Sequence, residues 1–222
     1  MNQLTNTSYL VYMYRYFIKT HRLVKRLFPA YVWSMPATEK VVYLTFDDGP
    51  HPRATPFVLD ELKKHAAEAT FFCLGKNVLQ HPDLYRRILA EGHATGNHTH
   101  DHLNGWKVTT EAYLANVAEA AKHIHSPLFR PPYGKIRRRQ ARQITELLGP
   151  HSRIIMWDVL SADFATSLSG EDCLGYVLKY YGPGSVIVFH DSEKAFPRLE
   201  YVLPRVLERL GQEGYRFLKI GS

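Results

Sequence analysis

The chain has 222 residues, of which 45% are hydrophobic, 13% aromatic and only 22% charged. A disordered chain is poor in aromatic residues and rich in charge, so this composition excludes disorder as the overall state. A chain of this length also builds its own hydrophobic core, which excludes a small disulfide-stapled scaffold. The formal net charge of +7 is compatible with an anionic partner but does not identify one.

The first 38 residues are expected to be an extension of the main domain. An apolar and aromatic run, YLVYMYRYFI, covers residues 9–18 and is shorter than the roughly 20 residues that span a bilayer. Most of the basic residues follow this run instead of preceding it, so we interpret it as a retained segment and not as a signal peptide. We therefore expect a cytoplasmic protein, either free or at the inner membrane face.

Two structures are open for this extension. The first is a helical segment, residues 1–38, that packs on the main domain. The alternative is a basic, aromatic helix within residues 1–35 that lies on an anionic membrane surface.

From residue 40 onward, strand-like and helix-like segments alternate along the chain. Strands are expected at residues 41–46, 69–74, 93–95, 154–157, 185–189 and 215–220. Helices are expected to begin at Thr55 as N-cap and to cover residues 84–89, 114–124, 137–148 and 199–210. Pro204 lies inside the last of these helices and predicts a kink or a break. The alternation is typical of a parallel sheet in an α/β fold, and we expect one such domain over residues 39–222.

Polar side chains follow several of the predicted strands. They are Asp47 and Asp48 after the first strand, His98 and His102 after the third, Arg130 after the short Leu128–Phe129 segment, Asp163 after residues 154–157, and His190 at the end of the next strand. Active sites of parallel α/β barrels form at the C-terminal ends of the strands, so we expect these groups to converge.

The spacing of His98 and His102 is compatible with a metal site. Residues four apart lie on the same side of a helical turn, so both imidazoles can face one ion. A carboxylate from another strand would complete a three-ligand site of the kind that catalytic zinc uses. Ordinary core or surface histidines remain the alternative, because the chain contains 12 histidines. The pair Asp47 and Asp48 is equally open: it can supply a metal ligand and a general base, or it can belong to an ordinary DDGP turn.

Five motifs occur in a fixed order along the chain. They are TFDDGP (45–50), GNHTHDH (96–102), RPPYG (130–134), WDVLSADF (157–164) and VIVFH (186–190). In this order they resemble the five motifs of the NodB-type polysaccharide deacetylases, carbohydrate esterase family 4. The resemblance runs from about residue 40 to the end. It implies a distorted (β/α) barrel of about seven strand–helix units that removes acetyl groups from N-acetylated sugars with a divalent metal.

The resemblance also implies a metal set and a base. The implied ligands are Asp48, His98 and His102, and the implied metal is Zn²⁺, with Co²⁺ or Ni²⁺ as alternatives. Asp47 matches the catalytic base of the family. Arg130 matches the arginine that holds this base.

Further residues match the acid and the acetyl pocket of the family. His190 matches the general acid, and Asp163 matches the aspartate that pairs with it. Tyr133 matches the residue whose backbone N–H helps to bind the oxyanion. Phe164 and Val188 match apolar positions that line the acetyl group. The family often has tryptophan where Phe164 stands, and we expect the pocket to stay apolar.

The expected reaction is hydrolysis of acetyl groups from a chitooligosaccharide, peptidoglycan or a related N-acetylglucosamine glycan, which releases acetate and a free amine. The alternatives are a non-catalytic glycan-binding member, removal of O-acetyl groups from a glycan such as xylan, and the metal-free chemistry of relatives that act on cyclic amides. Every metal, base and acid position is filled, which argues against the non-catalytic and metal-free alternatives. The sequence contains no recognition motif for nucleic acid, so no nucleic-acid partner is expected.

Overall fold

The computed structural model describes residues 17–36 and 38–221. Residues 1–16, which contain most of the apolar run expected to be helical, lie outside the described residues. Within the described part, no helix combines the length and the apolar character needed to cross a bilayer.

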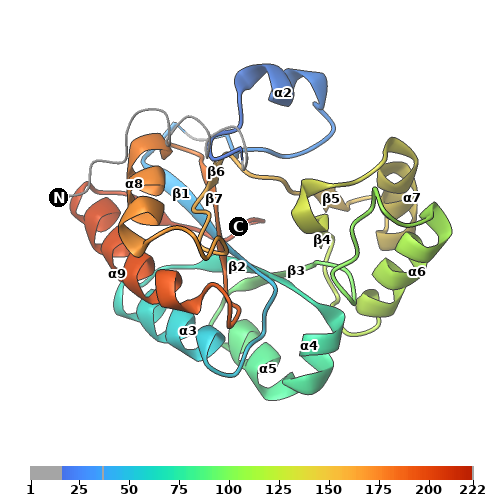
Figure 1. Ribbon diagram of the computed structural model, residues 1–222, viewed down its shortest axis with the longest axis horizontal. Helices are drawn as coiled ribbons and strands as arrows, with labels where there is room; N and C mark the ends of the chain where they lie inside the picture. Colours follow the sequence, from blue (N-terminus) through green and yellow to red (C-terminus); the bar gives the residue numbers. More distant parts are fainter. Residues whose placement is uncertain (1–16, 37, 222) are drawn as a thin grey trace.

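A curved, parallel sheet forms the centre of the fold, as the alternation of strands and helices predicts. Its order is β5-β4-β3-β2-β1-β7-β6, and β8 pairs with β1 beside this path. The strands are β1 (Val41–Asp47), β2 (Ala69–Cys73), β3 (Ala94–Asn97), β4 (Leu128–Phe129), β5 (Arg153–Ile154), β6 (Val159–Leu160), β7 (Val186–His190) and β8 (Arg216–Phe217). Figure 1 shows the strands curling into a barrel-like wall with helices outside it, which confirms the expected distorted (β/α) barrel.

Helices cover the outer face of this wall. They are α3 (Ala54–Lys64), α4 (Gly75–Gln80), α5 (Pro82–Ala90), α6 (Thr110–Ala121), α7 (Arg138–Leu148), α8 (Gly170–Tyr180) and α9 (Phe196–Gln212). A short 3₁₀ turn, η1 (Pro132–Gly134), precedes α7. Each helix lies between two strands, as the right-handed crossover of parallel strands requires.

Alternation along the central strands directs their polar ends into the barrel. Leu44 and Phe46 of β1 and Phe189 of β7 belong to the main hydrophobic core. Successive side chains of a strand point to opposite faces, so Asp47 and His190 face the barrel interior. Asp47 and His190 are also register partners on neighbouring strands.

The described part of the N-terminal extension lies along the open side of the sheet. Single bridges join Lys19 to Val159 and Val32 to Ile155, next to β6 and β5, the two ends of the sheet path. Between these bridges the chain forms one short helix, α2 (Arg22–Leu27). Figure 1 shows α2 on the side of the molecule away from α4 and α5.

The predicted start of α3 was wrong. The N-cap is Arg53, and Thr55 lies inside the helix. The Thr55 hydroxyl instead donates to the carboxylate of Asp191, so a tertiary contact takes the side chain that the sequence pattern assigned to capping.

Pro204 does not break α9, which is continuous from Phe196 to Gln212. Burial of the apolar stripe of this helix outweighs the loss of one backbone hydrogen bond at the proline. The strands expected at residues 154–157 and 215–220 shrink to β5 and β8. Beyond Ile154, Ile155 pairs with Val32 of the extension only as a single bridge.

Candidate active site

The loops at the C-terminal ends of the strands have an unusual backbone. Seven non-glycine residues of the described chain have positive φ. Five of them follow strands at this end of the barrel: Asp48, Thr99, His102, Tyr133 and Ala162. Left-handed backbone costs free energy for residues with a Cβ, so a cluster of such residues is typical of a functional site.

Asp48, His98 and His102 form a group that can hold a metal ion. One ligand atom from each residue lies within 4.8 Å of the other two. His102 Nε2 is 3.2 Å from Asp48 Oδ1, and His98 Nε2 is 3.7 Å from the same oxygen. This oxygen is buried and has no hydrogen-bond partner. A buried carboxylate oxygen without a donor, facing two imidazole nitrogens, fits a divalent cation bound between them.

The two histidines converge through a loop and not through a helical turn, so the geometric reason behind the i, i+4 argument was wrong. Residues 98–102 contain no helix. Each ring is oriented by its other nitrogen instead: His98 Nδ1 donates to the carbonyl oxygen of Arg130 at 2.8 Å, and His102 Nδ1 lies 3.1 Å from the Tyr133 hydroxyl. Such outer partners fix the ring so that Nε2 faces the metal.

Both imidazoles are held in the neutral form, which is the form that binds metals. Burial, together with the neighbouring His102, lowers the pKa of His98 to about 3. Burial also lowers the pKa of His102, although the Asp48 carboxylate opposes this change. Neither proton therefore competes for the ligand nitrogens near neutral pH.

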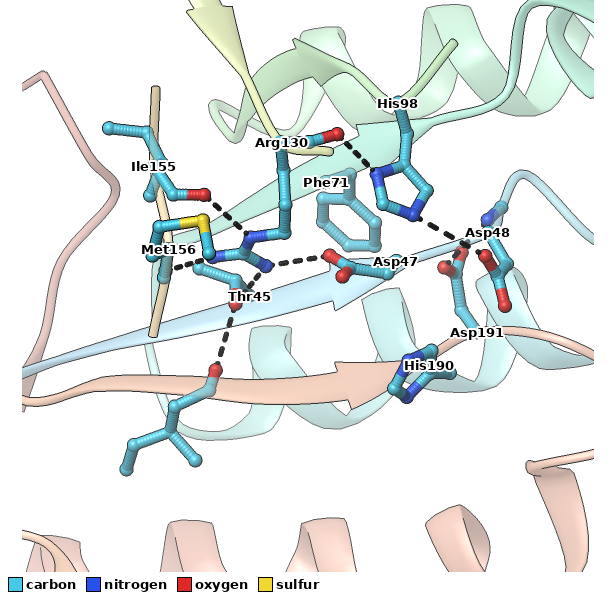
Figure 2. Close-up of polar contacts among 12 residues, drawn as sticks. Thr45, Asp47, Asp48, Phe71, His98, Arg130, Ile155, Met156, His190 and Asp191 are labelled. Carbon is cyan, nitrogen blue, oxygen red and sulfur yellow. Dashed lines mark hydrogen bonds and ion pairs between the residues drawn. The ribbon is translucent and has the colours of Figure 1, made fainter. Parts of the chain in front are cut away.

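Arg130 is fully buried and holds Asp47 in place (Figure 2). Its Nη1 donates to Asp47 Oδ1 at 2.6 Å and to the Thr45 hydroxyl at 2.8 Å. Nε and Nη2 donate to the carbonyl oxygens of Ile155 and Met156. Burial lowers the pKa of the guanidinium, and the Asp47 charge opposes this shift. Because the backbone carbonyl of Arg130 also orients His98, one residue positions both the carboxylate and a metal-ligand candidate.

His190 pairs with Asp163, as the resemblance implies. Asp163 Oδ1 accepts from His190 Nδ1 at 2.8 Å, and Oδ2 accepts from the His190 backbone N–H. Burial disfavours the charged imidazole, but the attraction of Asp163 outweighs it and raises the pKa of His190 to about 9. His190 is therefore protonated at neutral pH and has a proton to donate.

The three residues implied to line the substrate lie around these groups. The Tyr133 ring is 4.5 Å from the His102 ring, and its side chain is exposed. The Phe164 ring stands edge-on to His190 at 5.0 Å. Val188 is buried on β7, beside Thr45 of β1. The structure thus brings all ten predicted site residues to one end of the barrel.

Asp191 was missed by the sequence interpretation. It is fully buried, and its carboxylate accepts from the Gly49 N–H at 3.1 Å and from the Thr55 hydroxyl at 2.5 Å. A Cβ at Gly49 would lie 2.0 Å from Asp191 Oδ2, so only glycine fits the turn next to Asp48. Burial raises the pKa of Asp191 to about 8. The available signal was its position directly after His190 at a strand end.

Known proteins are similar to this chain in sequence and in architecture. Residues 34–151 match the polysaccharide deacetylase family. A peptidoglycan-N-acetylglucosamine deacetylase of Bacillus cereus is 36% identical over 200 residues, covering 87% of this chain and 71% of that protein. A chitooligosaccharide deacetylase of Rhizobium leguminosarum bv. trifolii is 35% identical over 172 residues, covering 73% of this chain and 79% of that protein.

A solved structure agrees with these sequence matches. It is a peptidoglycan N-acetylglucosamine deacetylase in complex with an N-hydroxybenzamide compound, with a TM-score of 0.80 and 34% identity. The match covers 86% of this chain and 91% of that one. Sequence, fold and the grouped Asp and His side chains agree, and the chain belongs to the polysaccharide deacetylase family.

Proposed function

We propose that this protein is a metal-dependent N-deacetylase of N-acetylglucosamine glycans, which releases acetate and leaves a free sugar amine. The observation that carries the proposal is that the Asp48, His98 and His102 group lies beside two ion pairs, one with a candidate base and one with a candidate acid. In one pair the Asp47 carboxylate is fixed by Arg130. In the other, His190 is kept protonated by an aspartate. Relatives named for peptidoglycan and chitooligosaccharide deacetylation support this substrate class.

The metal is proposed to be Zn²⁺, since two neutral imidazoles and one carboxylate form a typical catalytic zinc set, although Co²⁺ and Ni²⁺ accept the same ligands. When bound at Asp48, His98 and His102, a divalent cation would polarise the acetamide carbonyl and lower the pKa of a water molecule.

Asp47 is proposed to accept the proton of the attacking water. Its Oδ1 is occupied by Arg130 at 2.6 Å, so Oδ2 is the oxygen left to act as base. Arg130 cannot take the proton itself, because its guanidinium stays charged and has no acceptor. Its contacts with Thr45, Ile155 and Met156 keep the pair from shifting during the reaction.

His190 is proposed to donate a proton to the departing amine. Asp163 holds Nδ1, so Nε2 is the nitrogen that faces the substrate. The Tyr133 backbone N–H is proposed to stabilise the oxyanion, and Phe164 with Val188 is proposed to exclude water around the acetyl methyl group.

The test is acetate release from chitooligosaccharides and from peptidoglycan fragments, with Zn²⁺ or Co²⁺ supplied and with a chelator as control. Asp47→Asn is expected to lower the rate by about 10²–10⁴-fold, because proton transfer by a positioned base contributes this much. Asp158→Asn is the matched control, since it makes the same change at another buried aspartate, outside the site. His102→Ala should lose bound metal in elemental analysis.

The alternatives give different results in the same assay. Acetate released from acetylated xylan, but not from N-acetylated sugars, would assign the site to O-deacetylation. No release from any acetylated glycan by protein that contains stoichiometric metal would support the non-catalytic alternative.

A further inference from the structure

Most of the net positive charge of this protein comes from its N-terminal end, where acidic residues are absent. Residues 1–38 contain five of the 28 Lys and Arg residues, whereas all 21 Asp and Glu residues lie beyond residue 38. This segment therefore carries +5 of the formal net charge of +7. The remainder of the chain is close to neutral, so the asymmetry is a property of this segment and not of the deacetylase barrel.

Apolar side chains are exposed in the same segment. Phe17, Leu23 and Leu27 are 60%, 57% and 61% exposed, and Phe28 is exposed next to them. No residue of α2 is buried. Together with the exposed Arg22 and Arg26, these side chains form what we call the N-terminal patch.

An aromatic cluster adjoins the patch. The Phe28 and Tyr31 rings stack at 5.9 Å, and Trp33 is 6.3 Å from Tyr31. Tyr31 and Trp33 also line a cavity of about 330 Å³, in which Lys25 and Arg153 are the charged side chains. Tyrosine and tryptophan beside cations are typical of surfaces that sit at the water–lipid boundary.

Polar contacts join the patch to the barrel. Lys19 and Lys25 donate to the two oxygens of buried Asp158 at 2.7 and 2.6 Å. Thr20 donates from its backbone N–H to the Asp158 carbonyl and from its hydroxyl to the Trp157 carbonyl. Because both lysine side chains point toward the barrel, the exposed side chains of α2 are its leucines and arginines, and Phe28 is exposed directly after the helix.

We propose that the N-terminal patch binds the surface of an anionic phospholipid bilayer. Charge complementarity favours this occupant: the patch contains cations and no acidic side chain, whereas a second copy of the same surface would place arginines against arginines. An amphipathic helix with apolar and basic side chains buries the former at the headgroup boundary and pairs the latter with lipid phosphates.

The proposal is tested by co-sedimentation of the full chain with vesicles of phosphatidylglycerol and phosphatidylcholine, and with vesicles of phosphatidylcholine alone. Binding is expected only to the anionic vesicles and should weaken as salt is raised. Leu23→Ser with Leu27→Ser is expected to reduce binding at least about tenfold, because it removes the apolar contribution. Arg22→Gln with Arg26→Gln should reduce binding by about 25-fold, since each basic side chain contributes roughly fivefold.

Matched controls exist on the opposite side of the molecule. Leu79 of α4 and Leu89 of α5 are also exposed, and Leu79→Ser with Leu89→Ser should leave vesicle binding unchanged (Figure 1). Melting curves of all variants show whether each one is folded. Equal binding by patch and control variants would overturn the proposal. Absence of vesicle binding by the wild-type protein would also overturn it. This holds whether the protein is a monomer or forms a dimer that the Leu23→Ser, Leu27→Ser variant no longer forms.

Discussion

Two buried aspartates, one at each end of the barrel, are paired with cations in different ways. At the candidate active site, Asp47 meets Arg130, whose side chain has no exposed surface. Where the N-terminal segment contacts the barrel, Asp158 forms ion pairs with Lys19 and Lys25, whose side chains remain 36% and 24% exposed. The first pair depends entirely on its partners for charge compensation. In the second, the two ammonium groups are also in contact with solvent.

The difference follows from what each pair has to do. Arg130 fits a fixed set of acceptors, and a planar guanidinium holds Asp47 and its neighbours in one geometry. Lysine ammonium groups adapt to many geometries, which suits a contact that only joins the N-terminal segment to the barrel. The same aspartate–cation pairing therefore positions a reactive carboxylate at one end and fastens a segment at the other.

Replacing Arg130 should have the largest effect. Arg130→Met leaves the Asp47 carboxylate buried without its partner, and we expect the free energy of unfolding to fall by about 3–5 kcal/mol. Acetate release should fall to background, because the base loses the guanidinium that orients it. Urea unfolding followed by fluorescence measures the first effect.

Asp47→Asn combined with Arg130→Met separates charge burial from function. The double variant should regain part of the lost stability, since no isolated charge remains, and it should stay inactive. If Arg130→Met alone lowers the free energy of unfolding by less than about 1 kcal/mol, the Asp47–Arg130 pair contributes no more to stability than an exposed ion pair does.

Of the two aspartate–cation pairs, only the pair at the candidate active site could be predicted from the sequence. The alternation of elements predicted the parallel sheet, and motif order predicted Asp47, Asp48, His98, His102 and Arg130 as neighbours. Strand ends in a parallel sheet meet at one edge, so their residues converge whatever the loops do. The loops themselves were not predictable, because positive φ at Asp48 and His102 is imposed by tertiary contacts.

The second pair had no local signal at all. Asp158 lies 139 residues from Lys19 and 133 residues from Lys25, and no sequence pattern in either segment predicts the contact. Asp191 and Thr55 were missed for the same reason, because the hydroxyl that looked like a helix cap is used by a carboxylate far along the chain.

Removing the partner of His190 should have the next largest effect, and it depends on pH. Asp163 raises the pKa of His190 to about 9 from 6.5, so wild-type activity should fall as pH rises through about 9. In Asp163→Asn the fall should begin at or below 6.5, which gives a loss of roughly 30-fold at pH 8. The pH profile of kcat/KM is the measurement.

The free energy of unfolding should depend on pH in the same direction as the activity. A raised histidine pKa stabilises the folded state fully below pH 6.5, and this contribution is lost as pH rises towards 9. In Asp163→Asn this alkaline loss should be absent. An unchanged alkaline limb in both profiles would show that another group donates the proton.

Asp158→Asn should have a smaller effect on stability and none on chemistry. We expect a loss of about 1–2 kcal/mol, because the two lysines return to water while hydrogen bonds to a charged acceptor are weakened. Burial opposes ionisation of Asp158, but Lys19, Lys25 and Ser185 outweigh it and lower its pKa below the ordinary 3.8. The wild-type advantage should therefore be present above about pH 4 and disappear at more acidic pH. Urea unfolding at the two pH values tests this, and reduced acetate release would contradict the separation of the two ends.

The smallest effects should come from a matched pair of hydroxyl deletions. The Thr45 hydroxyl accepts from Arg130 at 2.8 Å and donates to the Ile187 carbonyl at 2.9 Å. The Ser185 hydroxyl donates to Asp158 at 2.6 Å and accepts from the Gly182 N–H at 3.1 Å. Ser185→Ala should cost about 1 kcal/mol and leave deacetylation unchanged.

Thr45→Val should cost about as much in unfolding free energy, but it should also lower kcat several-fold, because Arg130 gains freedom to move and Asp47 moves with it. The informative quantity is the ratio of the two effects in each variant, measured as kcat against the unfolding midpoint. Equal stability losses with unequal activity losses would show that rigidity, and not burial alone, distinguishes the catalytic pair from the N-terminal pair. If the two variants lose the same stability and also the same activity, deacetylation tolerates movement of Arg130. The hydrogen bonds around Arg130 would then serve the fold and not the reaction.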